Sequence, residues 1–261
     1  MTAIAEPRPV VEARSPLGVA AWACALAAVL VQMAFPFTDG GTLALTAASV
    51  LLLAGAALLH AGAVGGPTAV GALLLVAGGG GLVAEAVGVR TGVPFGDYAY
   101  AGTLGPQVLG VPALVPLAWV MMAWPALVVA RLLVGPRGRL AVTAVGAWAL
   151  TAWDVFLDPQ MVDLGHWSWE HPTPALPGVA GIPLTNFAGW LLVSALVVGL
   201  LHLVVPPTGG RRGVPLTVYL WTFGSSVLAH AAFFGRPPVA LVGGVLMGVV
   251  AVPLVVRVWR R

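Results

Sequence analysis

Charge is the scarcest feature of this 261-residue sequence. Only 8% of its residues are charged, and all 12 basic residues are arginine, because the chain contains no lysine. A soluble globular domain carries about 25% charged residues, so a water-soluble fold of this composition would leave most of its surface apolar. A lipid bilayer requires no polar surface, and the 59% of hydrophobic residues therefore indicates an integral membrane protein.

Cysteine is almost absent as well. The single residue, Cys24, lies in an apolar stretch, which excludes a disulfide within the chain and any cysteine-rich zinc motif. The net charge of +3 does not indicate nucleic-acid binding, because no more than two arginines are adjacent. Residues 1–16 carry mixed charges and no clear signal-peptide cleavage site follows them, so the first apolar stretch is expected to remain as an anchor.

What the sequence does contain is a series of long apolar runs. A helix needs about 20 apolar residues to cross the hydrocarbon core, and the runs show no two-residue alternation that would favour strands. The sequence therefore predicts an all-α, polytopic membrane protein with about eight transmembrane helices. They are expected at Leu17–Phe35, Leu43–Ala63, Ala69–Val89, Ala113–Val134, Leu140–Leu157, Leu184–Val205, Leu216–Phe234 and Val239–Val258.

The distribution of arginine predicts the orientation. With the N-terminus in the cytoplasm, ten arginines lie on the cytoplasmic side and only Arg90 and Arg236 lie outside, as the positive-inside rule requires. The expected organisation is a cytoplasmic N-terminal tail (1–16), a single transmembrane helical domain (17–258) and a C-terminal tail (259–261). Two long loops, at about 90–111 and 158–183, then lie on the outer side of a multi-pass protein of the cell membrane.

Glycine and proline indicate where helices start and pack. Gly110–Pro112, Gly181–Pro183 and Gly213–Pro215 are interpreted as helix starts, since proline loses no needed N–H there. The run Gly78–Gly81 lies inside the third expected helix and predicts close packing against a neighbour.

Asp154 and Asp158 are the first candidates for chemistry. They lie four residues apart near the outer end of the fifth helix, so they share one helical face. Two adjacent carboxylates cannot both ionise without a large penalty, and one is therefore expected to keep its proton near neutral pH and serve as a proton donor. A helix that simply ends in an Asp-Pro turn is the alternative interpretation.

Two further acids are catalytic candidates on the same side of the membrane. Glu85 lies near the outer end of the third helix, and Asp97 lies in the first long loop. Either could orient a water molecule and take its proton. The alternatives are that Glu85 pairs with Arg90 and that Asp97 belongs to an aromatic turn at the membrane interface. No arrangement of histidines satisfies the spacing of a metal site, so no metal is predicted.

Aromatic and polar side chains gather at this predicted face. They are typical of the aromatic belt of membrane proteins and equally of a pocket whose rings stabilise a carbocation. The candidates for substrate binding are Tyr98, Tyr100, Trp153, Trp169, Asn186, Trp190 and His230.

Four segments resemble, in the same order, the CruF-type family of carotenoid biosynthesis proteins, which includes carotenoid 1,2-hydratases and bisanhydrobacterioruberin hydratases. These segments are Phe95–Tyr100, Leu109–Trp119, Thr151–Met161 and Gly181–Trp190. The resemblance implies a hydro-lyase without a cofactor. It would add water across a terminal isoprenoid double bond of an acyclic C40 or C50 carotenoid held in the bilayer. The family also implies a carotenoid glycosyltransferase or a prenyl-elongating enzyme as candidate partners.

Two other functions stay open at this point. A membrane prenyltransferase would need two aspartate-rich motifs around Mg²⁺, whereas Asp154 and Asp158 form one pair without a nearby basic residue. A transporter or a non-catalytic assembly partner would favour internal repeats and broken helices, and the sequence offers only weak Gly-X-Pro echoes.

Overall fold

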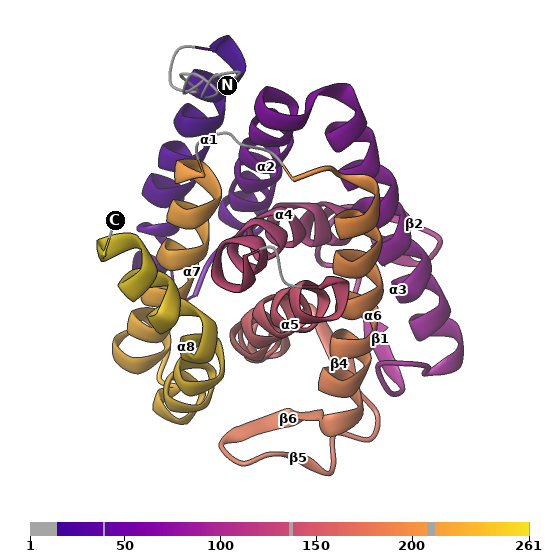
Figure 1. Cartoon of the computed structure of the whole chain (residues 1–261). Coiled ribbons are helices and arrows are strands. Elements are labelled where there is room, and N and C mark those ends of the chain that lie inside the picture. The colour runs from indigo at the N-terminus through magenta and orange to yellow at the C-terminus, as the bar shows by residue number, and fades with distance from the viewer. Residues whose placement is uncertain (1–14, 39, 136–137, 208–211, 261) are drawn as a thin grey trace, which may run out of the picture.

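The computed structural model describes residues 15–38, 40–135, 138–207 and 212–260. In this part of the chain the main elements are α-helices (Figure 1): α1 (Pro16–Gln32), α2 (Leu43–Ala72), α3 (Gly80–Thr91), α4 (Leu114–Val134), α5 (Arg139–Asp163), α6 (Leu184–Val204), α7 (Gly213–Ala232) and α8 (Pro237–Trp259). A 3-10 turn, η2 (Phe35–Phe37), follows α1, and a π-helical segment, η3 (Leu73–Gly79), joins α2 to α3. Most of the predicted N-terminal tail and Arg137, Arg211 and Arg261 lie outside the described residues.

The helices provide membrane-spanning segments. Six helical stretches of the described residues are long and apolar enough to cross a bilayer. The longest, Leu43–Thr91, contains α2, η3 and α3, and it turns at Gly66, whose φ of 65° and ψ of −165° are not helical. The predicted all-α membrane fold is thus confirmed, whereas the count of eight crossings is not.

Lipid-facing surface is visible on the outer helices. Large apolar side chains are exposed at four-residue spacing, which places them on one side of each helix. On α6 and α8 these residues are Leu192, Leu196, Leu200, Leu241, Val245 and Val249. In water such stripes would be a liability, but they match the hydrocarbon that surrounds a membrane helix.

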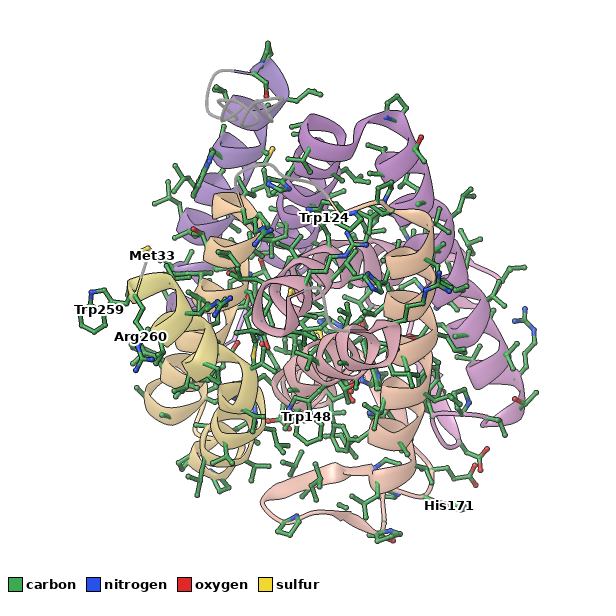
Figure 2. The ribbon with its side chains drawn as sticks, viewed as in Figure 1. Met33, Trp124, Trp148, His171, Trp259 and Arg260 are labelled. Carbon is green, nitrogen blue, oxygen red and sulfur yellow. The ribbon has the colours of Figure 1, made fainter. Side chains whose placement is uncertain are left out.

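Helix α4 lies at the centre of the bundle (Figure 1) and is buried without a break from Trp119 to Ala130. Trp124 lies among the interior side chains, whereas Trp259 projects from the end of α8 (Figure 2). A helix that is hydrophobic on all sides is expected in such a central position. A Cβ atom on Gly81 would lie 2.5 Å from Cγ of Trp119, so the close packing predicted for the glycine run is confirmed there.

Helix α5 is longer than predicted. It continues to Asp163, past the expected end at Leu157, with Pro159 inside it. Proline removes only one backbone donor, and the helix closes afterwards with Leu164 N–H donating to the carbonyl of Gln160. Asp158 is therefore helical, the Asp-Pro turn alternative is wrong, and the second long loop begins after Asp163.

The two long loops contain short antiparallel strands that the helical pattern did not predict. Strand β1 (Tyr98–Tyr100) of the first loop pairs with β4 (Trp167–Trp169) of the second, and this pairing joins the loops. Two hairpins complete the set: β2 (Gln107–Val108) with β3 (Val111–Pro112), and β5 (Ala175–Leu176) with β6 (Val179–Pro183). Helix α6 starts directly after Pro183, α7 starts at Gly213 and α4 starts shortly after Pro112, so the predicted helix starts are confirmed.

Candidate active site

A small cavity lies where the β1–β4 pair meets the helix ends. Its volume is about 80 Å³, several times the roughly 10–15 Å³ that one water molecule needs. Four helices supply its polar side chains: Thr46 from α2, Glu85 from α3, Asp158 from α5 and Asn186 from α6. Aromatic and aliphatic side chains form the rest of the wall.

The strand pair β1–β4 places four aromatic rings over this cavity. Side chains alternate between the two faces of a strand, and Tyr98 pairs with Trp169 while Tyr100 pairs with Trp167. All four line the cavity. The intervening Ala99 is exposed, as is Ser168 opposite it.

The same alternation explains the position of Asp97. Asp97 lies two residues before Ala99 and therefore lies on the same outer face. It is exposed and lies beside the turn at Gly92. Of the four predicted catalytic acids, Asp97 is the one that is exposed.

Asp154 and Asp158 form a buried pair on one face of α5, at 0% and 3% relative exposure. The side-chain amide of Asn186 donates to both, at 3.1 Å to Oδ2 of Asp154 and 2.5 Å to Oδ2 of Asp158. The indole of Trp167 donates to Oδ1 of Asp158 at 3.1 Å. Asp158 faces the cavity, whereas Asp154 lies behind it with its Oδ1 unpartnered. One amide thus holds two carboxyl groups together as a dyad.

No basic side chain neutralises this dyad within the described residues, where the recorded ion pair joins Arg236 to the exposed Asp163. Burying an uncompensated carboxylate is strongly unfavourable, and two together are more so. At least one proton is therefore expected to be held between Asp154 and Asp158.

Glu85 is the third buried acid, and its surroundings differ from those of the dyad. Its Oε2 accepts hydrogen bonds from the hydroxyls of Tyr98 at 2.5 Å and Tyr100 at 2.9 Å. Its Oε1 accepts one from the indole of Trp119 at 3.2 Å. Burial disfavours the charged form of this carboxyl group, and the three donors directed at it offset part of that cost. Oε1 keeps acceptor capacity, since it has a single partner, and Glu85 lines the cavity.

The two tyrosines can act only as donors here. Burial, and after it the negative charge of Glu85, raises the pKa of Tyr98 and the pKa of Tyr100 well above the ordinary value of 10.0. Both hydroxyls therefore stay protonated at physiological pH. The alternative interpretation, in which Glu85 pairs with Arg90, is wrong, because Arg90 donates to the backbone carbonyl of Ala86 instead.

The aromatic side chains contact one another around the cavity. The rings of Trp119 and Trp190 stack at 4.2 Å with 7° between their planes, and Trp153 packs edge-on against Trp190 at 6.1 Å. Tyr98 stacks on Trp169 at 5.8 Å. Trp153 thus supports the wall from outside the cavity lining.

Not every predicted binding residue reaches the cavity. Tyr98, Tyr100, Trp169, Asn186 and Trp190 line it. His230 is buried elsewhere, between the rings of Phe156 and Phe234, each 5.6 Å away. Of the loop histidines, His171 is exposed at the edge of the molecule (Figure 2), and Nδ1 of His166 lies 2.7 Å from the hydroxyl of Thr103. No group of three or more potential metal ligands forms among the described side chains.

Two polar residues of the wall, Trp119 and Thr46, were not singled out from the sequence. The indole of Trp119 donates to Glu85, and Thr46 joins the wall from α2. Trp119 lies within one of the four resembling segments, which could have indicated it. Nothing near Thr46 in the sequence distinguishes it from other small residues of an apolar helix.

Comparison with known proteins gives two matches. A family described as carotenoid biosynthesis protein matches residues 43–251. A bisanhydrobacterioruberin hydratase from Haloarcula japonica is 35% identical over 131 residues, which cover 49% of this chain and 43% of that protein. The match thus spans less than half of the relative's length. No solved structure matches the chain.

Proposed function

This chain belongs to the carotenoid biosynthesis protein family, and we propose that it is a carotenoid hydratase. The reaction adds water across a terminal isoprenoid double bond of an acyclic C40 or C50 carotenoid and gives a tertiary alcohol. The observation that carries this proposal is the buried Asp154–Asp158 dyad, one member of which faces a cavity walled by aromatic rings. The name of the relative from Haloarcula japonica supports the same reaction class.

Asp158 is the proton donor in this proposal. It is the dyad member that lines the cavity, and the dyad holds a proton because its two charges cannot both be buried. Asp158 transfers this proton to the less substituted carbon of the double bond, and the π electrons form the new C–H bond. The positive charge is left on the tertiary carbon. Asp154 and Asn186 act on Asp158 from behind by fixing its position and sharing its charge.

The aromatic wall stabilises the cation. Rings attract a positive charge through their faces, more strongly when water is excluded. Trp190 and Trp119 provide stacked indoles, and Tyr98 and Trp169 provide a second stacked pair. The Glu85 carboxylate adds a negative charge in the same wall. Such preorganised charges stabilise the transition state more effectively than mobile water does.

Water captures the cation, and Glu85 takes the released proton. The oxygen of the water bonds to the tertiary carbon, and one of its O–H bonds breaks as the proton moves to Oε1 of Glu85. That atom has one hydrogen-bond donor and can accept another. The cycle closes when the proton returns from Glu85 to the dyad, so the net reaction consumes one water and no cofactor. Asp97 has no role in this scheme because it is exposed.

The alternatives receive less support from the site. A prenyltransferase needs carboxylates gathered around Mg²⁺ and a diphosphate, whereas the oxygens of Asp158 already accept from Asn186 and Trp167. Neither transport nor the assembly of other enzymes requires a dyad that holds a proton beside an aromatic cavity.

The cellular setting belongs to the proposal as well. We place the protein in the cell membrane, with a single helical domain (17–258) and the cavity at the outer face. The carotenoid would lie among the helices and reach the cavity with its end group. Two partners remain predictions. One is a glycosyltransferase that acts on the tertiary alcohol, and the other is a prenyl-elongating enzyme that supplies the substrate.

The direct test is expression in a bacterium that accumulates acyclic carotenoids, followed by mass spectrometry of the lipid extract. We expect a more polar pigment heavier by the mass of one water, or of two. Asp97→Asn is a matched control, because it removes a carboxylate outside the cavity, and it should form the same pigment. An unchanged pigment profile with both C40 and C50 acyclic precursors would contradict the proposal.

A further inference from the structure

Two hydroxyl groups near the start of α2 are buried without a hydrogen-bond partner. They belong to Thr46, with 9% relative exposure, and Ser49, with 6%. A threonine or serine inside a helix usually satisfies its hydroxyl on the carbonyl four residues earlier. The carbonyl of Thr42 accepts only the backbone N–H of Thr46, at 2.9 Å. Since buried polar groups nearly always have partners, these two hydroxyls require an explanation.

The two residues differ in what they face. Thr46 lines the cavity together with Glu85, Asp158 and Asn186, whereas Ser49 does not. Thr46 is thus a residue of the cavity wall whose hydroxyl has no protein partner. Its side chain joins the wall from α2, and that of Asp158 joins it from α5.

The start of α2 is held in place relative to the dyad. The side chain of Gln160, two residues after Asp158 on α5, donates to the backbone carbonyl of Gly40 at 2.7 Å. The hydroxyl of Thr42 then caps α2 by accepting from the N–H of Leu45 at 3.3 Å. A site on a fixed helix is positioned more accurately than one on a loop, so Thr46 has a defined place in the wall that Asp158 also lines.

We propose that Thr46 binds the water molecule that adds to the carotenoid cation, an inference that rests on the hydratase function proposed above. A water in a polar cavity needs two to four partners. It donates one hydrogen to Oγ1 of Thr46 and the other to Oε1 of Glu85, which leaves a lone pair directed at the cation. As the C–O bond forms, the O–H bond towards Glu85 breaks and its proton moves to that carboxylate.

Three variants separate this role from simple packing. Thr46→Val keeps the shape of the side chain and removes the hydroxyl, whereas Thr46→Ser keeps the hydroxyl and removes the methyl group. Ser49→Ala is the matched control, because it removes an equally buried and unpartnered hydroxyl from the same helix outside the cavity.

The measurement is hydration in deuterium oxide with the full-length protein in membranes. An alkene that is protonated but not captured by water loses a proton again, so the recovered precursor gains deuterium. Thr46→Val should lower hydrated product by roughly 10- to 100-fold, the range that misplacing a reactant can produce, while deuterium still enters the precursor. Thr46→Ser should keep most of the hydration, and Ser49→Ala should match the unmodified protein.

The results of these experiments distinguish the water-binding role of Thr46 from the hydratase function itself. Full hydration by Thr46→Val, or a parallel loss of hydration and deuterium uptake, contradicts the water-binding role while the hydratase function stands. A loss by Ser49→Ala equal to that of Thr46→Val also contradicts it, because both hydroxyls would then act through packing. If the unmodified protein yields neither hydrated carotenoid nor deuterated precursor, the proposed function itself fails, and the role of Thr46 with it.

Discussion

The loop end of the bundle and the opposite end both contain buried or half-buried polar side chains, but these side chains have different surroundings. At the opposite end, the guanidinium of Arg131 donates to Nδ1 of His202 and to the backbone carbonyls of His202, Val205 and Pro206. Nearby in the interior, the indole of Trp124 donates to Nδ1 of His60 at 2.9 Å. These groups satisfy one another and hold helix ends together.

At the loop end, the polar groups keep unused hydrogen-bonding capacity. Thr46 Oγ1 and Asp154 Oδ1 have no partner, and Oε1 of Glu85 has one. Thr46, Glu85 and Asp158 also line the cavity described above, whereas Arg131 and His202 do not line it. Burial alone therefore does not identify a functional residue in a membrane protein. We propose that burial beside a cavity, together with unused hydrogen-bonding capacity, marks the functional residues here. If this difference holds, substitutions in the cavity wall should lower hydration, and substitutions at the opposite end should lower stability alone.

Replacing Asp158 should have the largest effect. Asp158→Asn removes the acid that faces the cavity, and general acid catalysis contributes about 10²–10⁴-fold, so hydration should fall by that amount. Asp154→Asn should cause a smaller loss, because the carboxyl group of Asp158 still faces the cavity. The measurement is the fraction of hydrated pigment at matched protein levels in the membrane. Equal activity of Asp158→Asn and the unmodified protein would exclude this proton donor.

Gly81→Ala should reduce stability and activity together. The new Cβ would lie 2.5 Å from Trp119, and overpacking of this kind costs about 1–3 kcal/mol. The displaced indole would lose its bond to Glu85 and its stacking on Trp190. Gly80→Ala is the control, because a Cβ there meets nothing within 4 Å. Thermal unfolding in detergent and the hydrated pigment fraction measure both effects, and identical results for the two variants would contradict the assignment.

At the opposite end, Arg131→Met should lower stability and leave the chemistry intact. It leaves the carbonyl of the buried Val205 without this donor, and an unsatisfied buried acceptor costs about 1–3 kcal/mol. The melting temperature should fall, while hydration per folded molecule should equal that of the unmodified protein. A loss of specific activity would mean that the two ends are coupled.

The smallest effect is expected from pH. Burial lowers the pKa of His166 below 6.5, and its Nδ1 lies 2.7 Å from the hydroxyl of Thr103. The unfolded chain therefore binds more protons than the folded chain between that lowered pKa and 6.5. The contribution of His166 to stability is fully present above 6.5 and decreases as the pH falls through this window. Melting temperatures from pH 7.5 to pH 5, with His166→Gln as the control that lacks this dependence, would measure it.

The sequence predicted those parts of the site that depend on helical periodicity. The spacing of Asp154 and Asp158 places them on one face of α5, and the topology correctly brought Glu85 and Asn186 to the same end of the bundle. His230 was expected there as well. It is buried between Phe156 and Phe234 instead, because α7 packs mainly against α8 and α4.

The loop residues were harder to predict. Strands β1 and β4 have three residues each and lie in different loops, so no local pattern reveals their pairing. That pairing alone decides that Tyr98 and Tyr100 face Glu85 while Asp97 points away. Thr46 depends on contacts across the whole bundle, between the start of α2 and the end of α5. Such long-range contacts cannot be derived from residue periodicity.

The most direct test of the central claim is isotopic. Purified protein in lipid is given an acyclic carotenoid in water labelled with oxygen-18, without dioxygen or added cofactor, and the product is analysed by mass spectrometry. We predict that the tertiary alcohol carries the labelled oxygen, and that Asp158→Asn forms little of it. Product without the label, or no conversion of any acyclic carotenoid, would contradict the account.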